Sequence, residues 1–292
     1  MRPARRTART AQLLTFTLLL LAIPLGSAEG SDTSAGPAWT FGGRDCSLIP
    51  LTAPSSETHP PEGCPGVRPG AGVWTDLGGC SLNFLFSGFW RDEHGKKVEA
   101  GTLAGTAGHC ILGQHNERSW YEGKGPTARD DNGERIGEFA YAILNDAKDF
   151  ALIRLDPGVE ASPSMCHWGG PTGIDNEETA QLKALYHFGQ GEVLGDVQPA
   201  RAALAFGTPH HDHVYAEGLA VPGDAGSGII SADGRALGVI VGTGVYSGRS
   251  ATTWSLDAGT LAITRLGVQV KRAEAYLGMD LELLTAPFDP IR

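Results

Sequence analysis

The sequence predicts an all-β fold with two strand-rich units and one short helix near the C-terminus. The chain of 292 residues contains 41 glycines and 18 prolines without a collagen-like period, and this excess favours short strands joined by tight turns. Short apolar runs alternate with turn signals along most of the chain. Apolar residues fall at helical spacing only near its end.

The first 28 residues have the pattern of an export signal. Four arginines precede an apolar run over residues 13–25, and small residues follow up to Ala28. The run is shorter than a membrane-spanning helix and contains Pro24, which argues against a retained membrane anchor. Because polar residues follow Arg5 and Arg6, general secretion is favoured over twin-arginine export. We therefore expect a secreted protein.

Removal of this signal makes the remaining chain more acidic. The whole chain has a formal net charge of −10, and cleavage after Ala28 removes four arginines, which gives −10 − 4 = −14. Nucleic acids and anionic membrane surfaces bind clustered Lys and Arg, which this chain does not show. We expect a monomer with no nucleic-acid partner, no membrane association after signal cleavage and no cofactor.

Residues 29–72 are interpreted as an N-terminal extension rather than a separate domain. This segment is rich in Pro, Gly, Ser and Thr and has little apolar periodicity. One interpretation is a removable pro-segment. We expect the folded domain over residues 73–280, with strand-rich units at about 73–160 and 175–270, and a tail at 281–292.

Two turn signals predict hairpins in the first unit. Residues 92–95 (DEHG) separate an aromatic, strand-like run from the next strand. Residues 131–133 (DNG) supply the second turn. The expected strands of this unit include residues 81–90, 127–129, 135–144 and 150–155.

The second unit follows a linker at residues 157–180, which is rich in proline and glycine. Asp233 and Gly234 predict a hairpin turn between its last two strand-like runs. Beyond these runs, apolar spacing predicts a helix over residues 266–277 that ends at Gly278. The expected strands of the second unit cover residues 182–189, 199–206, 213–218, 228–231 and 235–241.

Three motifs carry the residue types of nucleophilic catalysis. Gly105-Thr-Ala-Gly-His-Cys110 places a histidine at the end of a strand, and Asp149 begins an apolar run forty residues later. A glycine-rich loop then reads Pro222-Gly-Asp-Ala-Gly-Ser-Gly228. A single histidine is usually a packed or surface residue, and Asp149 alone is compatible with a strand-edge acid. The order of histidine, aspartate and glycine-rich loop points instead to a catalytic arrangement.

With these motifs, residues 73–270 resemble the trypsin/chymotrypsin family of serine proteases, in particular bacterial secreted members whose nucleophile loop reads Gly-Asp-Ser-Gly-Ser or similar. The resemblance implies two antiparallel β-barrels of the chymotrypsin type, packed at a seam that holds the active site, and a short C-terminal helix. It also implies a disulfide between Cys110 and Cys80, which lies on a preceding strand.

The resemblance also implies a role for each motif. His109 would act as general base and then as general acid, because imidazole titrates near neutral pH. Asp149 would hold the imidazole tautomer and stabilise the imidazolium. The backbone N–H groups of Gly223 and Ala225 would form the oxyanion hole. Asp224 is expected to order this loop rather than to take part in chemistry.

The sequence departs from the family at the nucleophile. Where the family has serine, this chain has Ala225, whose methyl group has no oxygen to attack a carbonyl. Ser227 is the alternative nucleophile, but a shift of two residues moves its Cα by about 5 to 7 Å, and a base must lie within about 3 Å of the proton that it takes. The residues before Ser227 also lack the Gly-Asp pair that positions the oxyanion donors.

All five cysteines follow the export signal, where an oxidising environment allows disulfides. Besides the pair implied above, Cys46 and Cys64 are a possible disulfide, although either of them is also a candidate partner of Cys166. An odd number leaves one cysteine without an internal partner. No pair has the C-x-x-C or Cys/His spacing of a structural zinc site, so we expect no metal.

Two further patterns carry less information. Residues 210–213 (HHDH) have metal-ligand chemistry, but adjacent strand residues face opposite ways and Pro209 marks a loop, so we expect a solvated turn. In the family that this chain resembles, substrate preference is set by a pocket whose positions correspond to Leu219 and residues 241–244. No acid or base lies there, which favours an apolar or small side chain in the ligand.

These observations leave three functional hypotheses. The favoured one is a secreted protease homologue, inactive as written, that binds peptide or protein in its active-site cleft. The alternative is an active serine endopeptidase of which this chain is a Ser-to-Ala variant, although the chain keeps its export signal and shows no tag. A structural or adhesive secreted module is compatible with the acidic composition, but no motif favours it.

Overall fold

The computed structural model describes residues 40–41, 44–45, 65–121, 123–166, 169–191, 200–244 and 259–288. The chain divides into two compact units, Met1–Ser47 and Leu48–Arg292. In the first unit, β1 (Thr40–Phe41) and β2 (Arg44–Asp45) form an antiparallel pair. The expected export signal and most of the expected extension lie outside the described residues. In the described part of the chain, no helix has the length and apolar character needed to cross a membrane.

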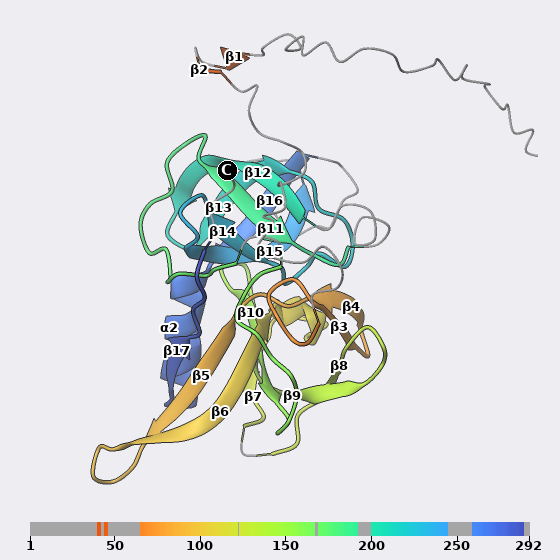
Figure 1. Cartoon of the computed structure of the whole chain (residues 1–292), viewed down its shortest axis with the longest axis vertical. Helices are drawn as coiled ribbons and strands as arrows, with labels where there is room; N and C mark the ends of the chain where they lie inside the picture. Colours follow the sequence, from red (N-terminus) through yellow and green to blue (C-terminus); the bar gives the residue numbers. More distant parts are fainter. Residues whose placement is uncertain are drawn as a thin grey trace, which may run out of the picture. The chain divides into compact units, whose positions relative to one another are not determined.

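Nine strands of the second unit form one antiparallel sheet (Figure 1). Their order is β17-β5-β6-β10-β9-β8-β3-β4, and β7 pairs with β9. Both expected turns are present, since β5 pairs with β6 and β8 pairs with β9 around them. The strands are β3 (Gly72–Thr75), β4 (Gly78–Ser81), β5 (Leu85–Arg91), β6 (Lys97–Thr106), β7 (Asn116–Ser119), β8 (Thr127–Arg129), β9 (Arg135–Leu144), β10 (Asp149–Leu155) and β17 (Asp280–Leu283).

Six later strands close into a barrel, and the all-β prediction is confirmed. The barrel order is β11-β12-β13-β16-β15-β14, and the hairpin expected at residues 233–234 joins β14 to β15. Among the described residues of the linker at 157–180, pairing is limited to isolated bridges. The barrel strands are β11 (Ala184–Phe188), β12 (Ala200–His210), β13 (His213–Gly218), β14 (Gly228–Ser231), β15 (Ala236–Gly244) and β16 (Gly259–Arg265).

The first sheet, which we call the open sheet, has β17 and β4 at the two ends of its strand order. Residues 82–84 join β4 to β5 and stay hydrogen-bonded to the sheet, since the N–H of Leu82 donates to the carbonyl of Ala71 at 2.8 Å and the N–H of Asn83 donates to the carbonyl of Gly105 at 2.8 Å. β17 pairs with the edge of β5 that does not face β6. Residues 281–283, which were expected in a tail, therefore lie in the sheet.

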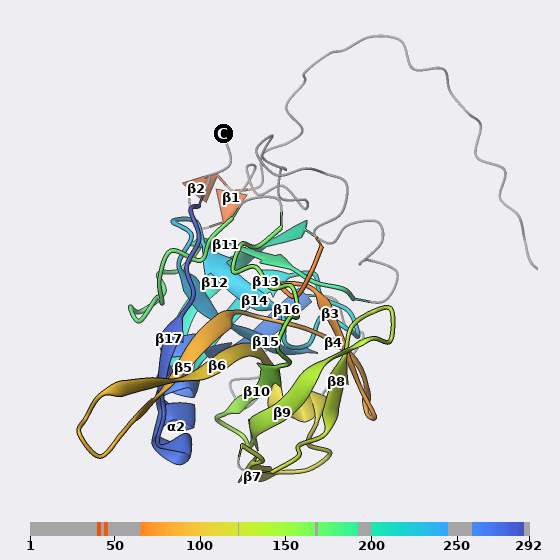
Figure 2. The same cartoon turned by 60° about the horizontal axis from the view of Figure 1, so that its bottom comes forward.

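The predicted helix is confirmed as α2 (Leu266–Leu277). Gly278 ends it in the left-handed conformation with φ +63°, and its N–H donates to the carbonyl of Glu274 at 2.8 Å. Leu266, Val270 and Ala273 are buried. Figure 2 shows α2 alongside β17, and the helix also packs on β15 and β16.

One hydrophobic core joins the open sheet to the barrel. It contains Phe84 and Phe150 on one side and Ile230 and Val239 on the other. At Gly228, the first residue of β14, an added Cβ would lie 2.7 Å from the ring of Phe84. Only glycine permits this close approach, so the end of the glycine-rich loop is held against the open sheet.

A histidine is buried inside the barrel. His187 of β11 lies opposite Arg201 of β12 and Ile229 of β14, and its side chain is fully buried. Burial, together with the positive charge of Arg201, lowers the pKa of His187 to about 3. His187 is therefore neutral in the folded protein at neutral pH.

This burial predicts a loss of stability in acid. Below about pH 6.5 the unfolded chain protonates His187 and the folded chain does not, so folding weakens by about 1.4 kcal/mol per pH unit down to pH 3. Above pH 6.5 His187 is neutral in both the folded and the unfolded chain, so the pH no longer changes its effect on stability. The free energy of unfolding is measured in urea at pH 7, 5 and 4 for the parent and for His187→Leu. Below pH 6.5, the variant should gain stability relative to the parent by about 1.4 kcal/mol for each unit that the pH falls. A difference that does not change with pH would contradict the buried neutral state.

Candidate active site

His109 and Asp149 come together because β6 and β10 are neighbours in the open sheet. His109 lies in η1 (Gly108–Cys110), directly after β6, and Asp149 is the first residue of β10. The Nδ1 atom of His109 lies 2.7 Å from Oδ2 of Asp149, and the backbone N–H of His109 donates to Oδ1 at 2.9 Å. The side chains are only 20% and 11% exposed. The carboxylate thus places the proton on Nδ1 and makes Nε2 the basic nitrogen.

The glycine-rich loop presents two backbone donors. Gly223 has φ +96°, a left-handed conformation that favours glycine. Among the described residues, no group accepts a hydrogen bond from the N–H of Gly223 or of Ala225. The N–H of Asp224, between them, donates to the carbonyl of Val221 at 3.0 Å. The N–H groups of Gly223 and Ala225 are therefore available to donate hydrogen bonds to a carbonyl or carboxylate oxygen of a ligand.

A buried ion pair fixes this loop from inside the barrel. Asp224 and Arg201 are both fully buried, and Nη1 of Arg201 donates to Oδ2 of Asp224 at 2.6 Å. The carboxylate also accepts the N–H groups of Gly191 at 2.9 Å and Val221 at 2.8 Å. Asp224 therefore orders the loop, as the sequence predicted. Arg201 was missed, and its only signal was a lone charge in an otherwise apolar strand.

Ala225 lies beside His109 in a pocket of about 180 Å³. Its side chain is 3% exposed, and its carbonyl accepts the N–H of Ser81 at 2.7 Å. The pocket is also lined by Leu77, Pro222, Gly223 and the cysteines of a disulfide. Ala225 thus lines the same pocket as His109 and Gly223.

Ser227 is not brought to His109. Its side chain is fully buried, and it does not line the pocket described above. An added Cβ at Gly189 would lie 2.6 Å from Oγ of Ser227 and 2.4 Å from Oδ1 of Asp224, so this hydroxyl lies on the inner side of the loop. The geometry offers no support for Ser227 as a nucleophile.

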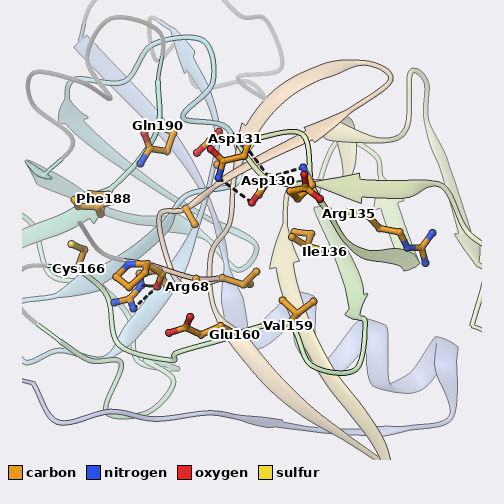
Figure 3. A pocket seen from close by; sticks show the side chains of 17 residues that line it. Arg68, Asp130, Asp131, Arg135, Ile136, Val159, Glu160, Cys166, Phe188 and Gln190 are labelled. Carbon is orange, nitrogen blue, oxygen red and sulfur yellow. Dashed lines mark hydrogen bonds between the residues drawn. The ribbon is translucent and has the colours of Figure 1, made fainter. Parts of the chain in front are cut away.

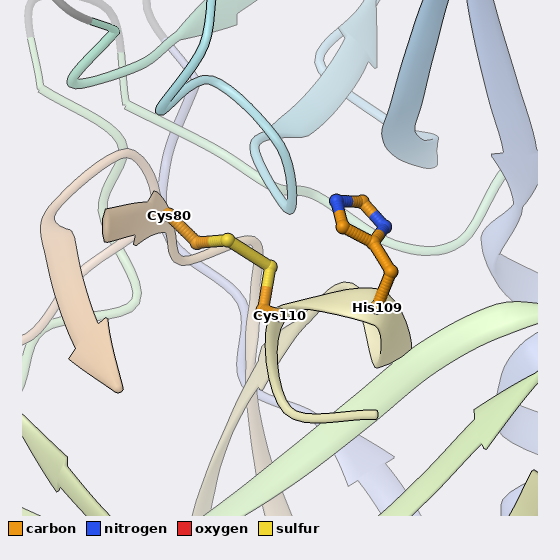
Figure 4. Close-up of side chains that lie close together, drawn as sticks. All are labelled: Cys80, His109 and Cys110. Atoms are coloured by element: carbon orange, nitrogen blue, oxygen red, sulfur yellow. A yellow bond between two sulfur atoms is a disulfide. The ribbon is translucent and has the colours of Figure 1, made fainter. Parts of the chain in front are cut away.

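The disulfide expected between Cys80 and Cys110 is confirmed and joins β4 to η1 beside His109 (Figure 4). Because the two sulfur atoms are bonded to each other, they provide no thiolates, although they lie with His109 in a cluster of metal-ligand type. Cys166 is also disulfide-bonded. Cys46 and Cys64 lie outside the described residues.

The histidine-rich string lies at a hairpin in the barrel. His211 and Asp212 form the turn between β12 and β13, as expected, and Asp212 lies 3.8 Å from the amine of Lys148. His213 is buried and stacks on Tyr215, so it is not part of a solvated turn. Burial of this side chain comes from its place in β13, where it pairs with Thr264.

The positions expected to set ligand preference are only partly described. Leu219 and Val241 are half-buried, and neither lines the pocket of His109. Residues 245–258, which follow β15, lie outside the described residues. The preference for an apolar or small side chain stays a prediction.

A larger cavity of about 560 Å³ lies elsewhere, between the open sheet, the linker and the end of β11 (Figure 3). It shares no lining residue with the pocket of His109. Arg68 at its edge donates to the carbonyl of Pro65 at 2.6 and 2.8 Å. Among its described lining residues there is no histidine, serine or free thiol, so it offers no nucleophile with a base.

Comparisons with known proteins find similarity only among solved structures. No family model matches the sequence, and no curated protein matches it. A glutamic acid specific serine protease is 16% identical, with 75% of this chain and 100% of that chain covered and a TM-score of 0.48. Nocardiopsis protease (NAPase) is 17% identical, with 74% and 98% covered and a TM-score of 0.48. Cellulomonas bogoriensis chymotrypsin is 17% identical, with 75% and 98% covered and a TM-score of 0.49.

The buried ion pair predicts a large stability effect. Arg201→Met leaves the carboxylate of Asp224 without its charge partner inside the barrel, and we expect a loss of about 3 to 5 kcal/mol in urea unfolding at pH 7. Arg91→Met is the matched control, because Arg91 pairs with Asp280 at 2.7 Å and the two side chains are 58% and 42% exposed. Loss of this exposed pair should lower the free energy of unfolding by about 1 kcal/mol or less. Equal losses in the two variants would show that the Arg201 pair does not hold the loop.

Proposed function

We propose that this protein is a serine protease homologue of the chymotrypsin type that binds a peptide or protein segment in its cleft without cutting it. The observation that carries the proposal is Ala225, which lines one pocket with Gly223 and with His109, whose Nδ1 contacts Asp149. These residues support binding of a carbonyl oxygen and transfer of a proton, and alanine at position 225 has no oxygen to attack a carbonyl.

Binding without cleavage follows from what each group does. The N–H groups of Gly223 and Ala225 are suited to one oxygen of a ligand, either a backbone carbonyl or a terminal carboxylate. His109, oriented by Asp149, has no hydroxyl to deprotonate at position 225. Loss of the nucleophile costs on the order of 10⁶ in turnover in another serine protease. The site then retains binding and loses acyl transfer.

The alternative is an active endopeptidase of which this chain is a Ser-to-Ala variant. The contact between His109 and Asp149 favours it, because that geometry is the one general-base catalysis needs. Both proposals predict that Ala225→Ser, which adds one oxygen atom, restores peptide-bond hydrolysis. The two proposals differ in whether the natural chain carries serine at position 225.

We also propose that the protein is secreted as a monomer. The pattern of residues 1–28 supports export, and disulfide-bonded cysteines at positions 80, 110 and 166 fit an oxidising compartment. Cleavage between residues 28 and 29 is checked by N-terminal sequencing of the exported protein, and the monomer by sedimentation.

Ala225→Ser should convert the protein into an enzyme. The new hydroxyl would attack a fluorophosphonate probe at phosphorus, fluoride would leave and His109 would take the proton. We expect covalent labelling and casein hydrolysis in Ala225→Ser only, with an increase of several orders of magnitude and up to about 10⁶. The double variant Ala225→Ser/His109→Ala should lose both the labelling and the hydrolysis. The double variant Ala225→Ser/Ser227→Ala should keep both. Labelling of the parent protein would overturn the assignment of position 225.

The unmodified protein should bind peptides through the two N–H donors. We expect fluorescein-labelled casein peptides to bind, as measured by fluorescence polarisation, and Gly223→Val to weaken binding tenfold or more, because valine strains the +96° backbone that directs the N–H. Gly133→Val is the matched control, since Gly133 has φ +80° in an open turn far along the sheet. Equal effects of the two valines, or no binding by the parent, would argue against a peptide-binding cleft.

A further inference from the structure

Ser81 connects the open sheet to the glycine-rich loop. It is the last residue of β4 and is fully buried. Its hydroxyl donates to the carbonyl of Gly223 at 2.8 Å and accepts the N–H of Gln190 at 2.9 Å. One side chain therefore ties together β4, the loop and the segment that follows β11.

The backbone of Ser81 is fixed at the same place. Its N–H donates to the carbonyl of Ala225 at 2.7 Å, and its carbonyl accepts the hydroxyl of Thr106 at 2.8 Å. These two bonds hold the backbone of Ser81 in the position from which its hydroxyl donates to Gly223. Both residues that carry the oxyanion donors have their carbonyls bound by this one serine.

These bonds restrain the backbone of the two residues that carry the donors. The peptide unit between Gly223 and Asp224 is held at its carbonyl by Ser81 and at its N–H by Val221. Gly223 lacks a Cβ, so its +96° conformation competes with several others, and a bond from outside the loop is needed to select it. The N–H of Gly223 belongs to the preceding peptide unit, so the bond from Ser81 acts on it through the φ and ψ angles of Gly223.

We propose that Ser81 is a positioning residue that holds the loop of Gly223 and Ala225 in its oxyanion-binding conformation. The proposal rests on the proposed function, since it assigns a purpose to the two donors. Arg201 and Asp224 fix the loop from inside the barrel, and Ser81 fixes it from the open sheet. The site is thus formed only when the two halves of the domain pack together.

The kinetic test uses Ala225→Ser as the parent. Adding Ser81→Ala should lower kcat for a peptide ester about tenfold or more and change KM by less than about twofold, because the donors act mainly on the oxyanion of the transition state. Asn83→Ala is the matched control. Asn83 is fully buried two residues away and its side chain accepts the N–H of Phe84, without contact to the loop. It should lose stability but keep kcat. Equal losses of kcat in both variants would overturn the proposal.

A second measurement uses the unmodified protein and needs no activity. In hydrogen exchange followed by NMR, Ser81→Ala should speed exchange of the Asp224 amide about tenfold or more and shift the amide resonance of Gly223, while Asn83→Ala leaves both unchanged. Ser81→Cys, which keeps the size of the side chain, replaces Ser81→Ala if the alanine variant does not fold. If Ala225→Ser is inactive but these amides respond, the proposed function fails and the positioning role stands. If the amides do not respond, the positioning role is wrong.

Discussion

The site depends on the ion pair between Arg201 and Asp224. A charge pair buried in a barrel is costly unless its geometry is good and its remaining atoms are hydrogen-bonded, and here the carboxylate meets both conditions by also accepting two backbone N–H groups. Those bonds hold the side chain of Asp224 in a single orientation. On either side of it, no described group accepts the N–H groups of Gly223 and Ala225.

The two halves of the domain supply different parts of the site. The open sheet provides His109 and Asp149 from neighbouring strands, and the barrel provides the glycine-rich loop that contains Gly223 and Ala225. Packing of Phe84 against Gly228 and the bonds of Ser81 bring these parts to one pocket. The alanine at position 225 changes none of these contacts, because the neighbours of the loop bind its backbone.

Much of this arrangement was predictable because the signals are local. The helix at 266–277 has clear periodicity and ends at Gly278, and turn residues located the hairpins at 92–95, 131–133 and 233–234. The order of His109, Asp149 and the glycine-rich loop drew attention to residues that the fold brings together, since His109 contacts Asp149 and lines one pocket with Gly223 and Ala225.

Features that depend on distant contacts were not predictable. Strand β7 is polar and forms because β9 offers an edge, and β17 joins β5 from 189 residues away, as their side chains Arg91 and Asp280 illustrate. The buried charge of Arg201 is explained only by Asp224, which folding brings to it.

The most direct measurement is a crystal structure of the unmodified protein with a peptide selected from a random display library. The account predicts an uncut peptide whose carbonyl or carboxylate oxygen lies between the N–H groups of Gly223 and Ala225, with His109 still bonded to Asp149. A peptide bound elsewhere, or one cleaved in the crystal, would contradict it.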